Sequence, residues 1–445
     1  MRRYLLRRLM LIPVTLLGIT FVVFCLSRMV PGGPVERMLQ EQAMGALAGE
    51  KAGATPQASS LSEEDMERLE DLFNLREPMW RAYLQWLGLL PRHIAVARAE
   101  LPDAEGSSAA LTLRRSSGEA TQVRVSRRGS ELVLPEDAWL QEEGWVFVAE
   151  SPEDRARQWA RRNGREEDEA LIAARAQSPE CRHWRAVAYR ESFDGLLQGN
   201  LGRSYKYNES VVSMMARRLP VSVYLGVLAA LITYAVSVPL GVLKALTHKR
   251  VIDALTSVLI FVGYAVPGFA LGALMLVYLG ARLEWFPLYG LTSPDFARMG
   301  LAEQISDLAS HTVLPLLCYV VSAFAMTTMM MKNSLMEQIS ADYVRTAVSK
   351  GVSFRRAVVR HAFRNAFIPI ASTLGTVLCT MVGGSVLIER VFDIPGFGLL
   401  SYQALMDKDY SLIMGTLLLS SLLIIVGNLL SDILVACLDP RIRYD

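Results

Sequence analysis

A basic segment from Asp342 to Pro369 carries the side chains best spaced for binding a partner. Met336–Lys350 favours a helix that stops at Gly351, the residue type most common just beyond a helix C-terminus. Ser353 is a suitable N-cap for a second helix, although Arg356 stands where a capping box needs glutamate. The whole segment has a single acid, Asp342, and six cations: Arg345, Lys350, Arg355, Arg356, Arg360 and Arg364. The pattern predicts two short helices around a turn, which can transmit force from a soluble partner; an ordinary positively charged loop is the simpler alternative.

The sequence supplies no catalytic or metal-binding set. An ATPase needs Gly-x-x-x-x-Gly-Lys-Ser/Thr to cradle phosphate, and that pattern does not occur. The 5 histidines are scattered without metal spacing, and so are the 5 cysteines. Cys181 is alone in the long segment after the first apolar run, so that segment cannot form an internal disulfide. We therefore expect no catalytic residue, no cofactor and no metal, and an energy source on partner chains.

Long apolar runs flank the basic segment, although 20% of the residues are charged. Each run is long enough to cross a hydrocarbon core of roughly 30 Å. Backbone groups inside lipid must bond internally, so the runs predict helices. The six runs are Leu9–Val30, Leu219–Leu243, Ile252–Leu279, Thr312–Met331, Ala366–Ile388 and Leu412–Cys437.

The distribution of Lys and Arg predicts how these helices are oriented. Cytoplasmic loops carry an excess of both residues close to the membrane. Positive clusters lie in "MRRYLLRR", in the loop of Lys244, Lys249 and Arg250, in the basic segment with Lys332 before it, and in the tail of Arg441 and Arg443. Six spans with both termini in the cytoplasm satisfy this pattern. The first run ends in "SRMVPGGP" without a small-x-small cleavage site, so we interpret it as an uncleaved anchor.

The chain divides into an anchor helix (1–30), an extracytoplasmic segment (31–210) and a five-helix core (211–445) that contains the basic loop 333–365. Residues 41–60 are rich in Ala, Gly and Ser and predict a flexible stretch, and Ser62 is a plausible N-cap after it. An inserted subdomain at about 92–190 holds sixteen Arg, no Lys and seventeen acids, a balance that argues against nucleic-acid binding. "ALTLRRSSGEATQVRVSRRGSELVLP" predicts an antiparallel sheet with turns at Gly118 and Gly129, and "SPEDRARQWARRNGREEDEALIAARAQ" predicts helices starting at Ser151 or Pro152.

Four residues within the apolar runs are candidates for a translocation path. Pro267 and Gly268 can bend the third run and let a neighbouring helix approach, so the alternatives there are a pore-lining bend and tight packing. Met326 and Met330 offer an adaptable apolar surface; filling the core or facing lipid is the alternative.

The order of residues in the basic segment resembles the cytoplasmic coupling loop of ABC importer permeases. The common form of that loop is Glu-Ala-Ala, three residues, then Gly; here Arg345, Thr346 and Ala347 form the triplet and Gly351 the glycine. "RHAFRNAFIP" adds His361, Arg364 and Asn365. With "GNLGRSY", "RLPVSVYLG", "HTVLPLL" and "LIERVFDIPGFGLLSYQALMDKDYSLIMG", the chain resembles the first-subunit type of the dipeptide/oligopeptide permease family. "PGGP" and "FPLYGLTSPDF" are most similar to the Yej-type peptide importers.

This resemblance implies an all-α polytopic protein with six transmembrane helices of the type I ABC importer fold, plus a small α+β extracytoplasmic insert. It implies a bacterial inner-membrane permease for peptides whose coupling loop contacts ATPase subunits. The implied partners are a second homologous permease, two ABC ATPase subunits, an extracytoplasmic substrate-binding protein, the peptide and membrane lipid, with no nucleic acid. The Arg/Glu-rich insert departs from the family pattern, and its role stays open.

Two other classes of function compete with this one. An ion-coupled secondary transporter usually shows internal repeats and ionisable residues near the membrane midplane. A membrane-anchored binding or sensor module would place its function in the insert. Since the apolar runs are nearly free of charge and unrepeated, the residues favour the ABC permease.

Overall fold

The computed structural model describes residues 2–29, 77–102, 106–115, 117–135, 137–162, 165 and 167–438. By its internal contacts the chain forms two compact units. We call Met1–Met29 with Leu201–Asp445 the helical unit, and Val30–Asn200 the insert unit. The predictions for residues 41–60, Ser62, "PGGP" and the tail with Arg441 and Arg443 lie outside the described residues.

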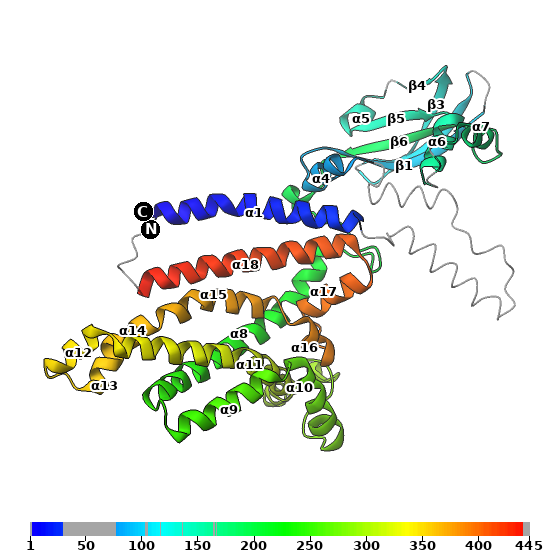
Figure 1. The fold of residues 1–445 in the computed structure, drawn as a ribbon. Coiled ribbons are helices and arrows are strands. Elements are labelled where there is room, and N and C mark those ends of the chain that lie inside the picture. The colour runs from blue at the N-terminus through cyan, green and yellow to red at the C-terminus, as the bar shows by residue number, and fades with distance from the viewer. Residues whose placement is uncertain are drawn as a thin grey trace. The chain divides into compact units, whose positions relative to one another are not determined.

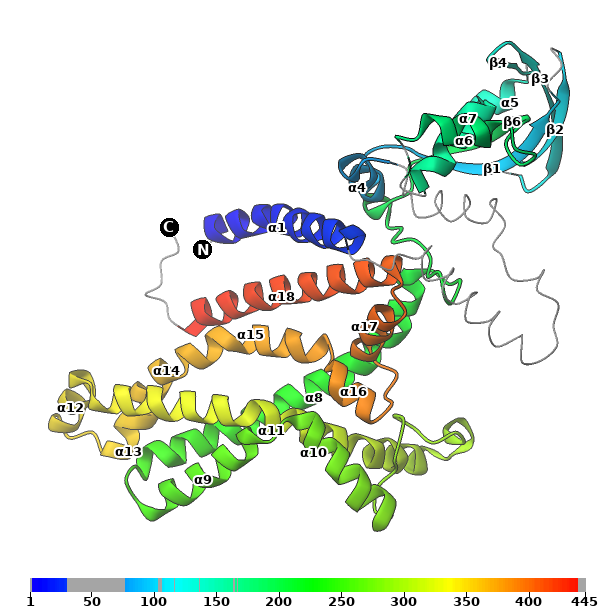
Figure 2. The same ribbon diagram turned by 45° about the vertical axis from the view of Figure 1, so that its right-hand side comes forward.

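Long helices build the helical unit. In Figures 1 and 2, α1, α18 and α15 lie side by side, and α8 crosses beneath them. Short helices around the bends connect the long ones. The elements are α1 (Arg2–Met29), α8 (Val211–Leu246), α9 (Val251–Ala265), α10 (Gly268–Met275), η3 (Leu276–Arg282), η4 (Phe296–Arg298), α11 (Leu301–Ser340), α12 (Asp342–Ser349), α13 (Phe354–Ala357), η5 (Val358–Ala362), α14 (Phe363–Ala366), α15 (Ile368–Val382), α16 (Val386–Val391), α17 (Phe397–Met406) and α18 (Tyr410–Leu438).

Among the described residues, 5 helical stretches are long and apolar enough to cross a membrane. They are Leu9–Leu26 in α1, the whole of α8, α11 and α18, and Ile368–Val391. The pair Asp253–Ala265 and Gly268–Arg282 makes a sixth if it is counted as one span, although its halves meet at 87°. The mostly helical architecture confirms the predicted fold class.

The structure refines three of the predicted spans. The run Ile252–Leu279 bends where Pro267 and Gly268 lie, because Val266 and Pro267 adopt extended backbone with ψ of 118° and 132°. The helix of the second span starts at Val211, before the predicted Leu219, so Pro220 lies inside it. The run Ala366–Ile388 is also interrupted: α15 ends at Val382, and the chain turns before α16.

A core of buried apolar side chains joins α8, α10, α11, α15 and α16. Its members include Leu225 of α8, Leu314 of α11 and Ile394 after α16, all within 2% of full burial. Because these helices touch through one continuous core, a shift of any of them must be accommodated by the others.

The insert unit contains two three-stranded antiparallel sheets. One has the order β1 (Arg92–Leu101), β6 (Trp184–Ser192), β5 (Trp145–Glu150); the other has the order β2 (Ser108–Arg114), β3 (Ala120–Arg128), β4 (Glu131–Val133). Its helices are α4 (Met79–Leu87), α5 (Ala138–Glu142), α6 (Pro152–Arg162) and α7 (Glu169–Ala176), with η2 (Leu196–Gln198) near its end. The sheets share a core that includes Leu101, Leu113, Val125 and Ala186, each fully buried.

The predicted sheet, turns and helices of the insert are confirmed. Gly118 and Gly129 join β2, β3 and β4 with φ of +91° and +66°. Ser151 caps α6 by accepting from the Asp154 N–H at 3.1 Å. The prediction missed β1, β5 and β6. In β6 the residues from Arg185 to Ala188 are all buried, so both faces of the strand are covered. Its sequence therefore lacks the alternation of apolar and polar residues that predicted β2 and β3.

We predict that the insert can be removed without loss of the helical core. Arg92 and Ser192 are paired across β1 and β6, so their Cα atoms lie about 5 Å apart and a short Gly/Ser linker can replace residues 92–192. No core residue of the helical unit is lost. The shortened chain should enter the membrane fraction and be purified at the level of the full chain.

The variant Leu113→Asp provides a control, since it keeps the chain length but places an unpaired acid in the insert core. It should also insert normally while its insert becomes sensitive to protease. Aggregation or degradation of the whole shortened chain would show that the helical unit depends on the insert.

Candidate functional site

The predicted turn between two basic helices is present, and Gly351 shapes it. The predicted helix Met336–Lys350 is wrong at its start, because Ala341 is extended with ψ of 148° and separates α11 from α12. The Gly351 N–H bonds to the Val348 carbonyl at 2.9 Å, and the Val352 N–H bonds to the Ala347 carbonyl at 3.1 Å. This pair of bonds is a Schellman motif, which needs a left-handed residue after the helix. Gly351 has φ of +89°. A Cβ there would meet nothing within 4 Å, so only the backbone conformation restricts this position to glycine.

One face of this element is anchored in an apolar cluster. The cluster joins the ends of α8 and α11 to α12, α13, η5 and α14. Its buried members are Ala245, Met331, Leu335, Val344, Ala357, Val358, Ala362, Ala366 and Ile370, and we call it the loop cluster. The opposite face is exposed and includes Arg345, Thr346, Ser353, His361 and Arg364. The element is therefore a rigid base with an outward basic surface.

Several of the predicted loop residues brace the element itself. Asn365 Nδ2 donates to the Tyr343 hydroxyl at 3.2 Å, which joins α14 to α12. Arg364 Nε donates to the Leu438 carbonyl at 3.1 Å, which joins the loop to the end of α18. The Thr346 hydroxyl bonds back to the Asp342 carbonyl at 2.8 Å, and Ala347 packs half-buried against the loop cluster.

Ser353 occupies the N-cap of α13, but its side chain makes no capping bond. Its carbonyl accepts the Ala357 N–H at 2.9 Å, so the backbone alone starts this helix. The incomplete capping box predicted from Arg356 agrees with this geometry.

A buried carboxylate, that of Glu389, lies at the centre of the helical unit. It accepts from the Leu399 N–H at 2.8 Å, from the Ser222 hydroxyl at 2.9 Å and from the Tyr319 hydroxyl at 3.4 Å. Its side chain is fully buried. Gly396 lies so close that a Cβ there would stand 2.4 Å from Glu389 Oε2. One acid thus joins α16 to α8, α11 and α17.

The two hydroxyls that bind Glu389 are themselves fixed. The Phe397 N–H donates to Ser222 Oγ at 2.7 Å, and the Ser385 N–H donates to Tyr319 Oη at 2.7 Å. Each hydroxyl accepts a hydrogen bond from a backbone amide and donates its own hydrogen to the carboxylate. Every donor in this network therefore has an acceptor. Sequence analysis missed Glu389, although an acid between "VLI" and "RVF" and followed by "PGFG" was a signal for a buried partner.

A second buried polar cluster joins α8, α9 and α11. Lys332 Nζ contacts both Asp253 carboxylate oxygens, at 2.8 and 2.9 Å. Lys244 Nζ lies 2.9 Å from Asp253 Oδ1 and also donates to the Asp253 carbonyl and the Ser257 hydroxyl. Lys244 and Lys332 were interpreted only as markers of orientation, but both are buried in ion pairs. Removing one partner of such a pair leaves an uncompensated buried charge.

A third set of contacts fastens the segment before α8 to the turn between α17 and α18. The Ser204 hydroxyl donates to Asp409 at 2.5 Å, and Lys206 Nζ donates to Asp407 at 2.6 Å. The Tyr207 hydroxyl also donates to Asp407, at 3.2 Å. Burial raises the pKa of Tyr207, and the nearby Asp407 carboxylate raises it further. Ser204 of the "GNLGRSY" motif, with Lys206 and Tyr207 just after it, therefore holds two distant parts of the chain together.

The candidate path residues fall at two places. Pro267 and Gly268 form the bend between α9 and α10; a Cβ on Gly268 would lie 2.2 Å from Ser322 Oγ, so α10 begins directly against α11. Met326 and Met330 lie one turn apart on α11. Met326 is 67% exposed, whereas Met330 packs against the loop cluster. Among the described residues, no group of three His, Cys, Asp or Glu side chains is arranged to hold a metal.

Several known proteins are similar to this chain. The model for the inner membrane component of binding-protein-dependent transport systems matches residues 237–444. The peptidoglycan transport system permease protein YejB of Agrobacterium fabrum is 40% identical over 249 residues, which cover 55% of this chain and 68% of that protein. The oligopeptide transport system permease protein AppB of Bacillus subtilis is 32% identical over 259 residues, 58% of this chain and 80% of that protein. A chain of the inward-facing MetNI methionine ABC transporter aligns with a TM-score of 0.40 at 17% identity, over 51% of this chain and 97% of that chain.

We predict that Glu389→Gln destabilises the helical unit. The amide NH₂ must face one of the donors that now meet a carboxylate oxygen, which leaves a buried donor unpaired at a cost of about 1–3 kcal/mol. The melting temperature of the purified protein should fall. Glu337→Gln is the matched control, because Glu337 is an exposed acid on α11. Equal melting temperatures for the two variants would contradict a structural role for the Glu389 carboxylate.

Proposed function

Because the chain belongs to the family of inner membrane components of binding-protein-dependent transport systems, the permeases of ABC importers, we propose that it carries peptides across the bacterial inner membrane. Membership makes it a multi-pass transport subunit, and ATP is hydrolysed by partner ATPases. The peptide substrate is supported by relatives whose names describe peptide, oligopeptide and peptidoglycan transport. The observation that carries the proposal is the rigid basic element of α12 to α14.

The exposed face of that element is the proposed seat of an ATPase subunit. The residues proposed to meet the ATPase or to brace the loop against it are Arg345, Thr346, Ala347, Gly351, Ser353, His361, Arg364 and Asn365. The complete importer would contain this chain, a second homologous permease, two ABC ATPase subunits and an extracytoplasmic binding protein. Since the loop cluster joins α12 and η5 to the ends of α8 and α11, movement of the ATPases would reach those helices directly.

Transport would alternate between inward-facing and outward-facing states. ATP-driven closure of the ATPase pair would pull the coupling loops and shift the permease pair outward. A docked binding protein can favour the outward state only by binding that state more tightly. Pro267 and Gly268 at the α9–α10 bend, with Met326 and Met330 on α11, are the proposed residues of the path.

The proposed orientation places both termini and the α12–α14 element in the cytoplasm and residues 31–210 outside. It is supported by the excess of Lys and Arg near one set of helix ends. Long external segments translocate largely regardless of their charge, so the arginines of the insert agree with this orientation.

We predict that Gly351→Val abolishes uptake while the complex still assembles. Valine at φ of +89° is strained by roughly 1–2 kcal/mol, so the Schellman turn must rearrange and shift α12 against α13. The measurement is ATP-dependent uptake of a radiolabelled oligopeptide into proteoliposomes that contain the whole importer and its binding protein.

Ser349→Val is the matched control, since Ser349 is exposed and helical two residues earlier. It should retain uptake. Normal uptake by the Gly351 variant with its ATPases bound would disprove the coupling role of this turn, and absence of uptake by the unaltered importer would disprove the peptide substrate.

We predict opposite thiol accessibility for the insert and the basic element. Ser130→Cys and Ser349→Cys each place an exposed thiol, one in the insert and one in α12, and the native Cys181 is buried and should not react. In spheroplasts of cells with Cys437 replaced by serine, a membrane-impermeant maleimide should label position 130 at once and position 349 only after lysis. The reverse order would invert the proposed orientation.

A further inference from the structure

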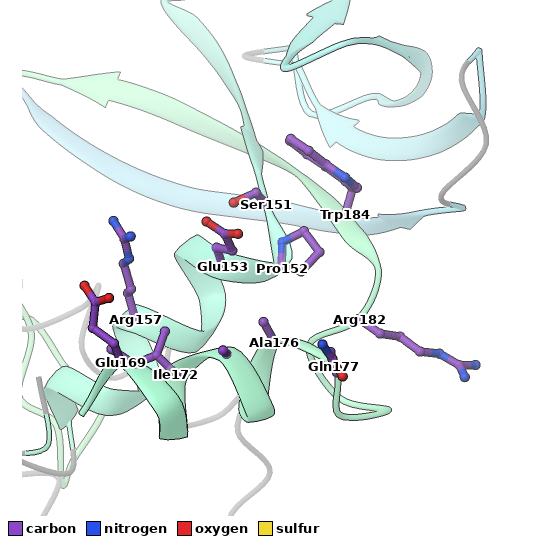
Figure 3. A pocket seen from close by; sticks show the side chains of 11 residues that line it. Ser151, Pro152, Glu153, Arg157, Glu169, Ile172, Ala176, Gln177, Arg182 and Trp184 are labelled. Carbon is purple, nitrogen blue, oxygen red and sulfur yellow. The ribbon is translucent and has the colours of Figure 1, made fainter. Parts of the chain in front are cut away.

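An open hollow of about 820 Å³ lies in the insert unit, between α6, α7 and the start of β6. This volume is in the range of ligand pockets, roughly 300–1,000 Å³. Figure 3 shows its lining side chains, with Glu153 and Arg157 on α6, Glu169 on α7, and Arg182 and Trp184 at the β6 side. Nothing in the proposed transport cycle uses this hollow.

The floor of the hollow is apolar. Ile172, Ala173 and Ala176 follow one face of α7 at helical spacing, and Pro152 and Trp184 also line the hollow. Because alanines make up part of the α7 face, a ligand chain can approach the helix closely. Such a floor gives affinity through apolar contact, while orientation must come from the polar rim.

Charged side chains on the rim lack the hydrogen-bond partners that a neighbouring charged side chain has. The side chains of Glu153, Arg157 and Glu169 have no hydrogen bond or ion pair with any part of the chain that the structure describes. Beside them, Arg155 donates to the carbonyls of His183 and Glu180, at 3.0 and 2.5 Å. The structure thus satisfies an arginine that braces the fold and leaves Glu153, Arg157 and Glu169 available. Arg182 donates from Nε to His183 Nε2 at 2.9 Å, and its two terminal nitrogens have no hydrogen bond to the described part of the chain.

The signs of these charges restrict the ligand. Two arginines, Arg157 and Arg182, and two glutamates, Glu153 and Glu169, line the hollow, so its rim is neutral in sum but charged at separate points. A polyanion would need excess positive charge, and a simple cation would need excess acid. A zwitterion with separated ends satisfies both signs, and the arginine fork is suited to a carboxylate.

The length of the hollow sets the size of the ligand. In Figure 3, Arg157 and Glu169 lie at one end, and Gln177 and Arg182 lie at the other. The floor follows α7, whose 8 residues span about 12 Å at 1.5 Å per residue. An extended peptide advances about 3.3 Å per residue, so three or four residues fill this distance.

We propose that the α6–α7 hollow binds a short zwitterionic peptide, so that the permease itself holds a substrate molecule in its insert. The carboxylate of the peptide meets Arg182, its ammonium group meets Glu153 or Glu169, and its side chains lie on the α7 floor. This inference rests on the proposed peptide substrate. It takes the occupant to be free peptide rather than a tail of the binding protein.

The test is photo-crosslinking of the complete permease–ATPase complex in lipid nanodiscs, without binding protein. The probe is the tripeptide Ala–benzoylphenylalanine–Ala, and the crosslinked residues are mapped by mass spectrometry. Crosslinks should fall within residues 152–184. The same probe with an acetylated N-terminus and an amidated C-terminus should crosslink about tenfold less, the effect expected for a lost charge-assisted hydrogen bond.

Variants separate charge from shape. Arg157→Ala with Arg182→Ala should lower crosslinking about tenfold, and Ala173→Trp should lower it as much by filling the hollow while all charges remain. Arg124→Ala removes an exposed arginine from β3 and should change nothing. Crosslinks outside the hollow, or equal crosslinking by the blocked probe, would overturn the proposal.

Uptake of the same tripeptide, measured in parallel with binding protein and ATP, keeps the two proposals distinguishable. Uptake without crosslinks in the hollow would overturn the binding site and leave the peptide importer standing. Crosslinks in the hollow without uptake would establish the site and overturn the proposed transport. Competition by an isolated N-terminal peptide of the binding protein, but not by free tripeptide, would assign the hollow to docking instead and overturn substrate binding.

Discussion

The Glu389 carboxylate is the contact on which the arrangement of the helical unit depends. A fully buried acid is costly unless donors replace its water, and here three donors come from three different helices. Each donor is held in place. One is a backbone amide, and the other two are hydroxyls that each accept a hydrogen bond from a further backbone amide. Moving α8, α11 or α17 alone would leave a buried charge short of a partner. The network therefore favours these helices moving together.

The same two long helices are joined a second time, further along their length. α8 supplies Ser222 to the Glu389 network and Lys244 to the Asp253 cluster, while α11 supplies Tyr319 and Lys332. Tyr319 and Lys332 are 13 residues apart, which is about 20 Å along α11. Two buried polar contacts at this separation resist both sliding and rotation of α8 against α11, because each contact is satisfied in one register.

Local signals made the basic element predictable from sequence, and non-local contacts limited the rest. Gly351 predicted the end of one helix and Ser353 the start of the next. In the structure α12 ends just before Gly351, and α13 begins just after Ser353. Pro267 and Gly268 predicted a bend in the third run, but hydropathy gives no angle, so the sequence did not predict that the two halves meet at 87°. The roles of Glu389 and Lys244 depend on Ser222 and Asp253, which lie 167 and 9 residues away along the chain, respectively. The roles of the loop and path residues, and the domain boundaries, remain predictions.

The position of the basic element follows from these constraints. α12 begins two residues after α11 ends, and the loop cluster fastens it to Ala245 of α8 and Met331 of α11. Ala245 adjoins Lys244, and Met331 adjoins Lys332, so the residues that hold the basic element are neighbours of those in the Asp253 cluster. A displacement applied to the exposed face of α12 thus reaches the α8–α11 pair at the point where it is fixed. Because Glu389 fixes the same pair about 20 Å away, the displacement is carried through the unit as movement of a rigid pair rather than lost as local bending.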